Sequence, residues 1–147
     1  MPTDEEQINK KLDDILTRLI RIQEQKDKFQ KSNSINELIE KIQDKKLRFF
    51  ELAILGRKLL ELLLSDLSNL NSDTPITVYE HINNLKSNNV ADWMISYLHT
   101  LRIFGNFVAH NSSSNTIPNQ MNKNDIIVFT YALDRFLEFY IVFNKNI

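Results

Sequence analysis

Apolar residues near the N-terminus recur with the spacing of a narrow helical stripe. Ile8, Leu12, Ile15, Leu19 and Ile22 follow one another at intervals of four, three, four and three residues. This is the a/d pattern of a coiled coil, although it lasts for only about three heptads. The pattern predicts an amphipathic N-terminal helix that either forms a short coiled coil or packs against the rest of its own chain.

Helix-capping motifs mark where the first two helices should begin. Thr3 and Glu6 have the spacing of a capping box, in which each side chain bonds to the backbone amide of the other residue. Ser34 and Glu37 repeat this spacing, and beyond them the apolar positions spread from one stripe to almost every side of the chain. This predicts one central helix of about 30 residues, ending in the polar cluster at 69–75.

Three further helices are predicted in the second half of the chain. A short helix should start near Thr77, and a helix of roughly 20 residues should end at the Ser/Asn run that follows His110. Asp125 should cap a last apolar helix, whose internal charges argue against a membrane span. With 2 Gly and 3 Pro in 147 residues, the chain favours long helices. The predicted fold is an all-α up-and-down bundle.

Charge divides the chain into two regions. Residues 1–48 contain 21 charged side chains, whereas residues 49–147 contain 16. A dense mixture of charges is typical of a solvated helix, and a sparse one of a packed body. We therefore predict a charged helical arm at 1–46, with an amphipathic or coiled-coil helix, and a helical bundle at 47–147.

Composition excludes several classes of function. The net charge of −1 provides no field that would attract DNA or an anionic membrane. Without cysteine there is no disulfide, thiolate zinc site or thiol nucleophile. We predict no metal, because His99 and His110 would lie about 16 Å apart along a helix and His81 is expected to be a lone surface residue. No cofactor motif occurs, and the N-terminus lacks a secretory signal, which predicts a cytoplasmic protein.

A polar ridge runs along an otherwise apolar helix. Arg102, Asn106 and His110 are spaced by four residues, so they advance by about 40° per step along one side of the helix. The residues between them are largely apolar, which commits the rest of this helix to the core. The ridge must therefore find polar partners or lie in a cleft.

A second polar island lies in the most apolar part of the predicted central helix. It consists of Arg57 and Glu61, and pairing of Glu61 with Arg57 or Arg102 would satisfy otherwise costly buried charges. The only glycines of the chain, Gly56 and Gly105, flank the two islands. We therefore predict that the two helices cross closely at these glycines and that the islands form a structural ladder of polar contacts.

The stretches around these islands, LAILGRKLLELLLSDL and LHTLRIFGNFVAH, resemble a known family. They are similar to bacterial HEPN-type domains of unknown function with an LHxLRxxGNxxxH signature, over roughly residues 49–143. The first stretch matches at Arg57 and Glu61, and the signature is matched at Leu98, His99, Leu101, Arg102, Gly105, Asn106 and His110. The resemblance implies a bundle of four to five helices that commonly dimerises and, in active members, cuts RNA without a metal.

The resemblance also implies which residues would carry that chemistry. Active members have Arg, a polar residue, three further residues and His. Here Asn106 and His110 fit, Gly105 occupies the arginine position, and Arg102 lies one turn earlier. Cleavage needs a base for the 2′-hydroxyl and a cation for the phosphate, which His110 and Arg102 would supply while Asn106 orients them. One such histidine per chain would require two chains.

Two functions follow as hypotheses. The first is a dimeric HEPN-like module of a bacterial defence or toxin–antitoxin type system, which is RNA-associated or has an interaction or regulatory role. The alternative is a metal-independent endoribonuclease that uses Arg102 and His110 across a dimer. The expected partners are a second copy of the chain, RNA, and a protein that binds the N-terminal helix.

Overall fold

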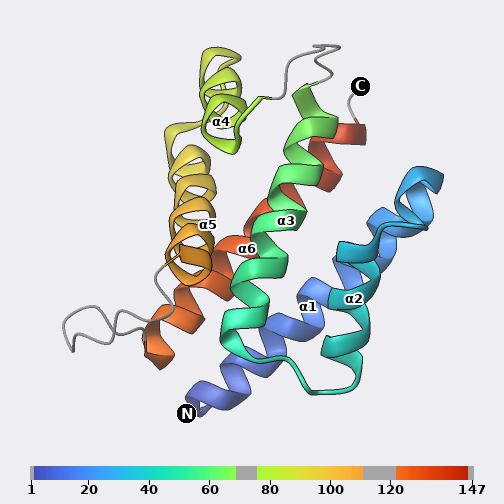
Figure 1. Ribbon diagram of the computed structural model, residues 1–147, viewed down its shortest axis with the longest axis vertical. Helices are drawn as coiled ribbons and strands as arrows, with labels where there is room; N and C mark the ends of the chain where they lie inside the picture. The colour runs from blue at the N-terminus through green and yellow to red at the C-terminus, as the bar shows by residue number, and fades with distance from the viewer. Residues whose placement is uncertain (1, 69–75, 111–121, 146–147) are drawn as a thin grey trace.

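The computed structural model describes residues 2–68, 76–110 and 122–145, apart from some side chains at the ends of these ranges (Figure 1). The predicted all-α fold is confirmed, since these ranges contain α-helices, one short 3-10 helix and no strand. The elements are α1 (Asp4–Gln25), the 3-10 helix η1 (Asp27–Phe29), α2 (Asn33–Gln43), α3 (Phe49–Ser68), α4 (Val78–Ser87), α5 (Asp92–His110) and α6 (Lys123–Lys145).

Helices α3 and α6 form the centre of the bundle. Helix α3 packs against α2, α4, α5 and α6, while α6 also packs against α1 and α5. In Figure 1, α4 and α5 lie on one side of α3, α1 and α2 lie on the other, and α6 runs behind it. The buried residues of all six helices form one hydrophobic core. None of the described helices is long and apolar enough to cross a membrane.

The apolar stripe of α1 packs against its own chain. Ile15, Leu19 and Ile22 are fully or almost fully buried in the common core, and α1 lies along α6. The first of the two predicted arrangements, an intermolecular coiled coil, is therefore not needed to cover the stripe. Ile8 and Leu12, at the start of the stripe, are only partly buried.

The predicted single helix of about 30 residues is wrong, because α2 and α3 are separated by residues 44–48. Lys45 has a φ of 56°, in the left-handed region, and the Lys46 N–H bonds to the Lys41 carbonyl at 3.1 Å. This is the hydrogen-bond pattern of a Schellman motif, which ends a helix by reversing the chain. Glycine usually occupies the left-handed position, and its presence in a sequence then marks the end of a helix. Because the residue here is a lysine, the sequence did not indicate that α2 ends at this point.

Helix starts were predicted with different success. The Thr77 cap of α4 and the Thr3 capping box of α1 are both present. The α2 cap is Ser32 rather than Ser34, which lies inside the helix. Asp125 bonds to the Asn122 amide at 2.8 Å from within the first turn of α6, so it supports the start of this helix without being its first residue.

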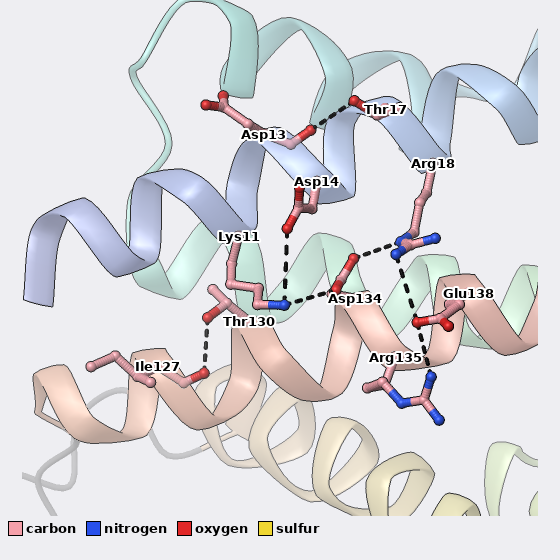
Figure 2. A network of polar contacts seen from close by, with 10 residues as sticks. All are labelled: Lys11, Asp13, Asp14, Thr17, Arg18, Ile127, Thr130, Asp134, Arg135 and Glu138. Carbon is pink, nitrogen blue, oxygen red and sulfur yellow. Dashed lines mark hydrogen bonds and ion pairs between the residues drawn. The ribbon is translucent and has the colours of Figure 1, made fainter. Parts of the chain in front are cut away.

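A buried carboxylate on α6 anchors α1 (Figure 2). Asp134 is 3% exposed and accepts hydrogen bonds from Lys11 Nζ at 3.2 Å and from Arg18 Nε at 2.7 Å. Arg18 also approaches Glu138 at 3.6 Å, and Glu138 pairs with Arg135 at 2.9 Å. Two cations therefore compensate the burial of one carboxylate, which fixes how α1 lies along α6.

A second carboxylate anchors the end of α1 and η1 to α3. Asp66 accepts hydrogen bonds from Lys26 Nζ at 2.7 Å and from Lys28 and the Tyr140 hydroxyl. Burial by itself would raise the pKa of Asp66, but these three hydrogen bonds outweigh it and hold the pKa below its usual value. The described residues of 1–46 and of 47–147 thus contribute to one hydrophobic core and are joined by ion pairs.

Candidate functional site

Helices α3 and α5 cross closely at Gly105, as predicted. A Cβ atom added to Gly105 would lie 2.6 Å from the Cβ and 2.9 Å from the Cδ of Arg57. Real Cβ atoms do not approach other carbons this closely, so only glycine permits the observed distance between the two helices. The predicted contact of the two helices that carry the polar islands is therefore confirmed.

Gly56 has a different neighbour from the one predicted. A Cβ atom at Gly56 would lie 2.8 Å from Cζ of Phe129, which belongs to α6. The Phe129 ring stacks on Phe104 of α5, with 6.0 Å between the ring centroids. Gly56 thus makes room for an aromatic ring of α6, while Gly105 makes room for α3.

Among the described residues, two side-chain polar atoms of α3 and α5 are buried without a hydrogen-bond partner. They are Nε of Arg57, a donor, and Oδ1 of Asn106, an acceptor. Asn106 directly follows the glycine that packs on Arg57. Buried polar groups in proteins are nearly always bonded, so these two atoms distinguish the α3–α5 crossing from the other buried polar side chains that the structure describes.

The predicted ladder through Glu61 is wrong. Glu61 is exposed, and within the described residues it forms no ion pair with Arg57 or Arg102. Its charge instead acts on His81, which is 5% exposed and therefore not the predicted surface residue. Burial lowers the pKa of His81, and the carboxylates of Glu61 and Glu80 oppose that shift. Glu61 can reach water, so it needs no buried cation.

Arg102 contacts a histidine of its own helix and a tyrosine of α4. Its Nε donates to Nδ1 of His99 at 3.3 Å, and its Cζ lies 5.2 Å from the centroid of the Tyr79 ring. The Tyr79 and His99 rings are 5.7 Å apart. Burial, Arg102 and Lys86 together lower the pKa of His99, which favours the neutral imidazole that this hydrogen bond requires. We refer to Tyr79, His99 and Arg102 as the Tyr79 cluster.

Tyr79 is a functional candidate that the sequence analysis missed. It is 52% exposed, and its ring contacts Arg102 and His99. The available signal was its position in a short amphipathic helix. Val78, Ile82 and Leu85 form the buried face of α4, and an aromatic residue outside such a face has no packing role to explain it.

The three residues of the predicted catalytic ridge have different environments. Arg102 is partly exposed and belongs to the Tyr79 cluster, whereas the amide oxygen of Asn106 is buried. His110 is the last residue of α5, and its side chain lies outside the described part of the structure. Arg102 and Asn106 thus lie on successive turns of α5, and no contact between their polar atoms is found among the described residues.

The described residues provide no metal site. Among the described residues, no group of three or more His, Asp and Glu side chains could hold a metal ion. Comparisons with protein-family models, curated proteins and solved structures find no match to this chain. The Tyr79 cluster and the α3–α5 crossing are therefore the features of this chain that bear on its function.

Proposed function

We propose that the protein is a HEPN-like, RNA-associated binding module of a bacterial defence or toxin–antitoxin type system, acting in the cytoplasm as a homodimer. The observation that carries RNA association is the Tyr79 cluster, which combines an exposed aromatic ring with a guanidinium group 5.2 Å away. The resemblance of the LHTLRIFGNFVAH stretch supports the setting and the dimer.

The chemistry of the cluster fits an unpaired nucleotide. A base that is not stacked in a duplex can stack on the Tyr79 ring, since this residue is 52% exposed. Arg102 can then bind a phosphate oxygen, and Lys86 lies near enough to add positive charge, since it helps to lower the pKa of His99. Because the chain has a net charge of −1, we propose binding to single-stranded RNA at this cluster rather than coverage of a duplex.

Fluorescence polarisation of a short labelled single-stranded RNA at low salt tests this proposal. Tyr79→Ala and Arg102→Gln should each weaken binding by roughly tenfold, as expected for the loss of one base stack or one phosphate contact. The matched controls are Phe50→Ala, another exposed aromatic residue, and Arg21→Gln, an exposed arginine of α1. Equal losses in the controls and the cluster variants, or no binding by the wild type, would refute it.

Metal-independent RNA cleavage is a second candidate function, supported by the state of Arg102. Within the described residues Arg102 forms no ion pair with a carboxylate, so its cation is available to a phosphate. Arg102 and His110 lie on the same helix, two turns or about 12 Å apart. A single His110 cannot act as acid and base together, so this mechanism needs the histidines of two chains.

The two functions differ in what happens to bound RNA. An endoribonuclease should cleave RNA in the presence of EDTA, leave cyclic phosphate ends, and lose this activity in His110→Ala while binding is retained. A binding module should hold RNA intact in both the wild type and His110→Ala. Intact RNA at saturating protein would eliminate the enzyme and leave the binding module.

A further inference from the structure

Helix α6 exposes a narrow stripe of side chains along its outer side. Val128, Tyr131, Arg135, Glu138 and Val142 follow one another at intervals of three, four, three and four residues. Val128 is 50% exposed, Tyr131 43% and Val142 55%, and the side chains of Arg135 and Glu138 are 38% and 39% exposed. We call these five residues the α6 stripe. Its spacing is the a/d pattern by which two helices pack side by side.

Helices α1 and α5 flank this stripe, and Arg18 of α1 approaches Glu138 at 3.6 Å. Lys11 of α1 lies 4.4 Å from the centroid of the Tyr131 ring, and Arg135 lies 5.0 Å from the centroid of the Trp93 ring on α5. Trp93 is itself 54% exposed beside the stripe. Apolar side chains at both ends and an opposed charge pair in the middle therefore remain in contact with solvent, which is typical of an interaction surface.

We propose that the α6 stripe binds the same stripe of a second copy of this chain in antiparallel orientation. A two-fold axis between Phe136 and Leu137 would place Arg135 opposite the partner's Glu138 and Tyr131 opposite the partner's Val142. Each contact then occurs twice, as an isologous interface requires. The inference specifies the surface of the dimer in the proposed function, but it does not depend on RNA binding.

The order of charges along the α6 stripe favours a second, antiparallel copy of the chain as the binding partner. Arg135 precedes Glu138, so reversing the direction of a second α6 sets each charge against its opposite, whereas a parallel copy would set like charges together. From Val128 to Val142 the stripe is about 21 Å long, at 1.5 Å per residue. A single pair of helices in contact over this length is a small interface, so we expect a weak dimer.

Complementary charge reversal provides the test, with sedimentation velocity as the measurement. The wild type should dimerise at tens of micromolar, on the order expected for a small interface. Arg135→Glu and Glu138→Arg should each weaken self-association by at least about tenfold, because like charges then face one another twice. An equimolar mixture of the two variants should recover the dimer as a heterodimer. The matched control is Arg21→Glu, an exposed charge reversal on α1.

Because the chain contains no cysteine, cross-linking can verify the register. Tyr131→Cys and Val142→Cys chains should form a disulfide with each other when mixed and oxidised, and neither should form one with itself. Both positions are exposed, so the variants should fold, as circular dichroism will show.

Several results would overturn the inference. They are a monomeric wild type, a dimer that survives both charge reversals, and a mixture that does not recover association. Polarisation measurements on the same samples separate this from the proposed function. A monomeric Arg135→Glu chain that still binds RNA would leave the RNA proposal intact, and a dimer that binds no RNA would leave the interface intact.

Discussion

The contact of α1 with α6 and the crossing of α3 with α5 both bury polar groups, but only the first satisfies them. On α6, the carboxylate of Asp134 has two cationic partners at 3.2 and 2.7 Å. At the crossing, Nε of Arg57 and Oδ1 of Asn106 are buried and have no hydrogen-bond partner among the described residues. A satisfied buried charge holds an interface in one geometry, whereas an unsatisfied polar group reduces stability unless something else binds it.

This difference indicates which of the two contacts is purely structural and which is a candidate for binding. The α1–α6 contact is explained by stability alone, because the buried carboxylate of Asp134 forms ion pairs with Lys11 and Arg18. The α3–α5 crossing is not, and it continues into the Tyr79 cluster, where a cation and an aromatic ring face solvent. Polar groups that stability does not explain are the better candidates for binding.

The largest expected effect is at Asp134. Asp134→Ala should lower the free energy of unfolding by about 3 kcal/mol, because it leaves Lys11 and Arg18 without their shared carboxylate. Urea denaturation measures the loss. Glu138→Gln is the control, since its carboxylate is 39% exposed and should contribute no more than about 1 kcal/mol. Equal small losses in both variants would show that the buried pair does not hold α1 in place.

Gly105 should produce the next largest effect. Gly105→Ala should lower the free energy of unfolding by about 2 kcal/mol, because its Cβ would meet Arg57 Cβ at 2.6 Å and push α3 and α5 apart. An alanine in an unconstrained helix would instead gain about 1 kcal/mol over glycine. Thermal or urea unfolding distinguishes the two signs, and a stabilised variant would show that the helices do not touch there.

Removing the guanidinium group of Arg57 should have a smaller effect. Arg57→Met keeps an unbranched side chain and deletes the buried Nε, so we expect the free energy of unfolding to change by less than about 1 kcal/mol in either direction. The same urea titration that is used for Asp134→Ala gives the direct comparison. A loss of about 3 kcal/mol would mean that Arg57 has a partner as important as that of Asp134.

The smallest effect concerns pH. Burial lowers the pKa of His81 and of His99 below the usual 6.5, so the unfolded chain takes up protons first as the pH falls through this value. Stability should therefore decrease from neutral pH towards acid, well before the lowered pKa of Asp66 has an effect below 3.8. Melting temperatures across this range measure the slope. A His81→Gln variant should reduce the slope, and an unchanged slope would contradict this assignment.

Local patterns allowed most of the helices to be predicted. Thr3 and Thr77 form caps with residues three positions further along the chain, and the Ile15 to Ile22 stripe repeats within one helix. Such signals involve residues that are close in sequence, so they can be recognised without the fold. The end of α2 could not be predicted, because the left-handed residue is Lys45 and only the folded chain selects that conformation.

What the sequence determined by itself was the all-α class, the apolar faces and the close crossing that Gly105 permits. The tertiary structure decided which polar groups meet: the arm's cations bind Asp134 and Asp66, Arg102 bonds to His99, and Glu61 faces water. Side chains on different helices meet only when both helices have the right rotation, and one residue of shift turns a side chain by about 100°. The spacing of residues within one helix does not determine how that helix is rotated relative to its neighbours.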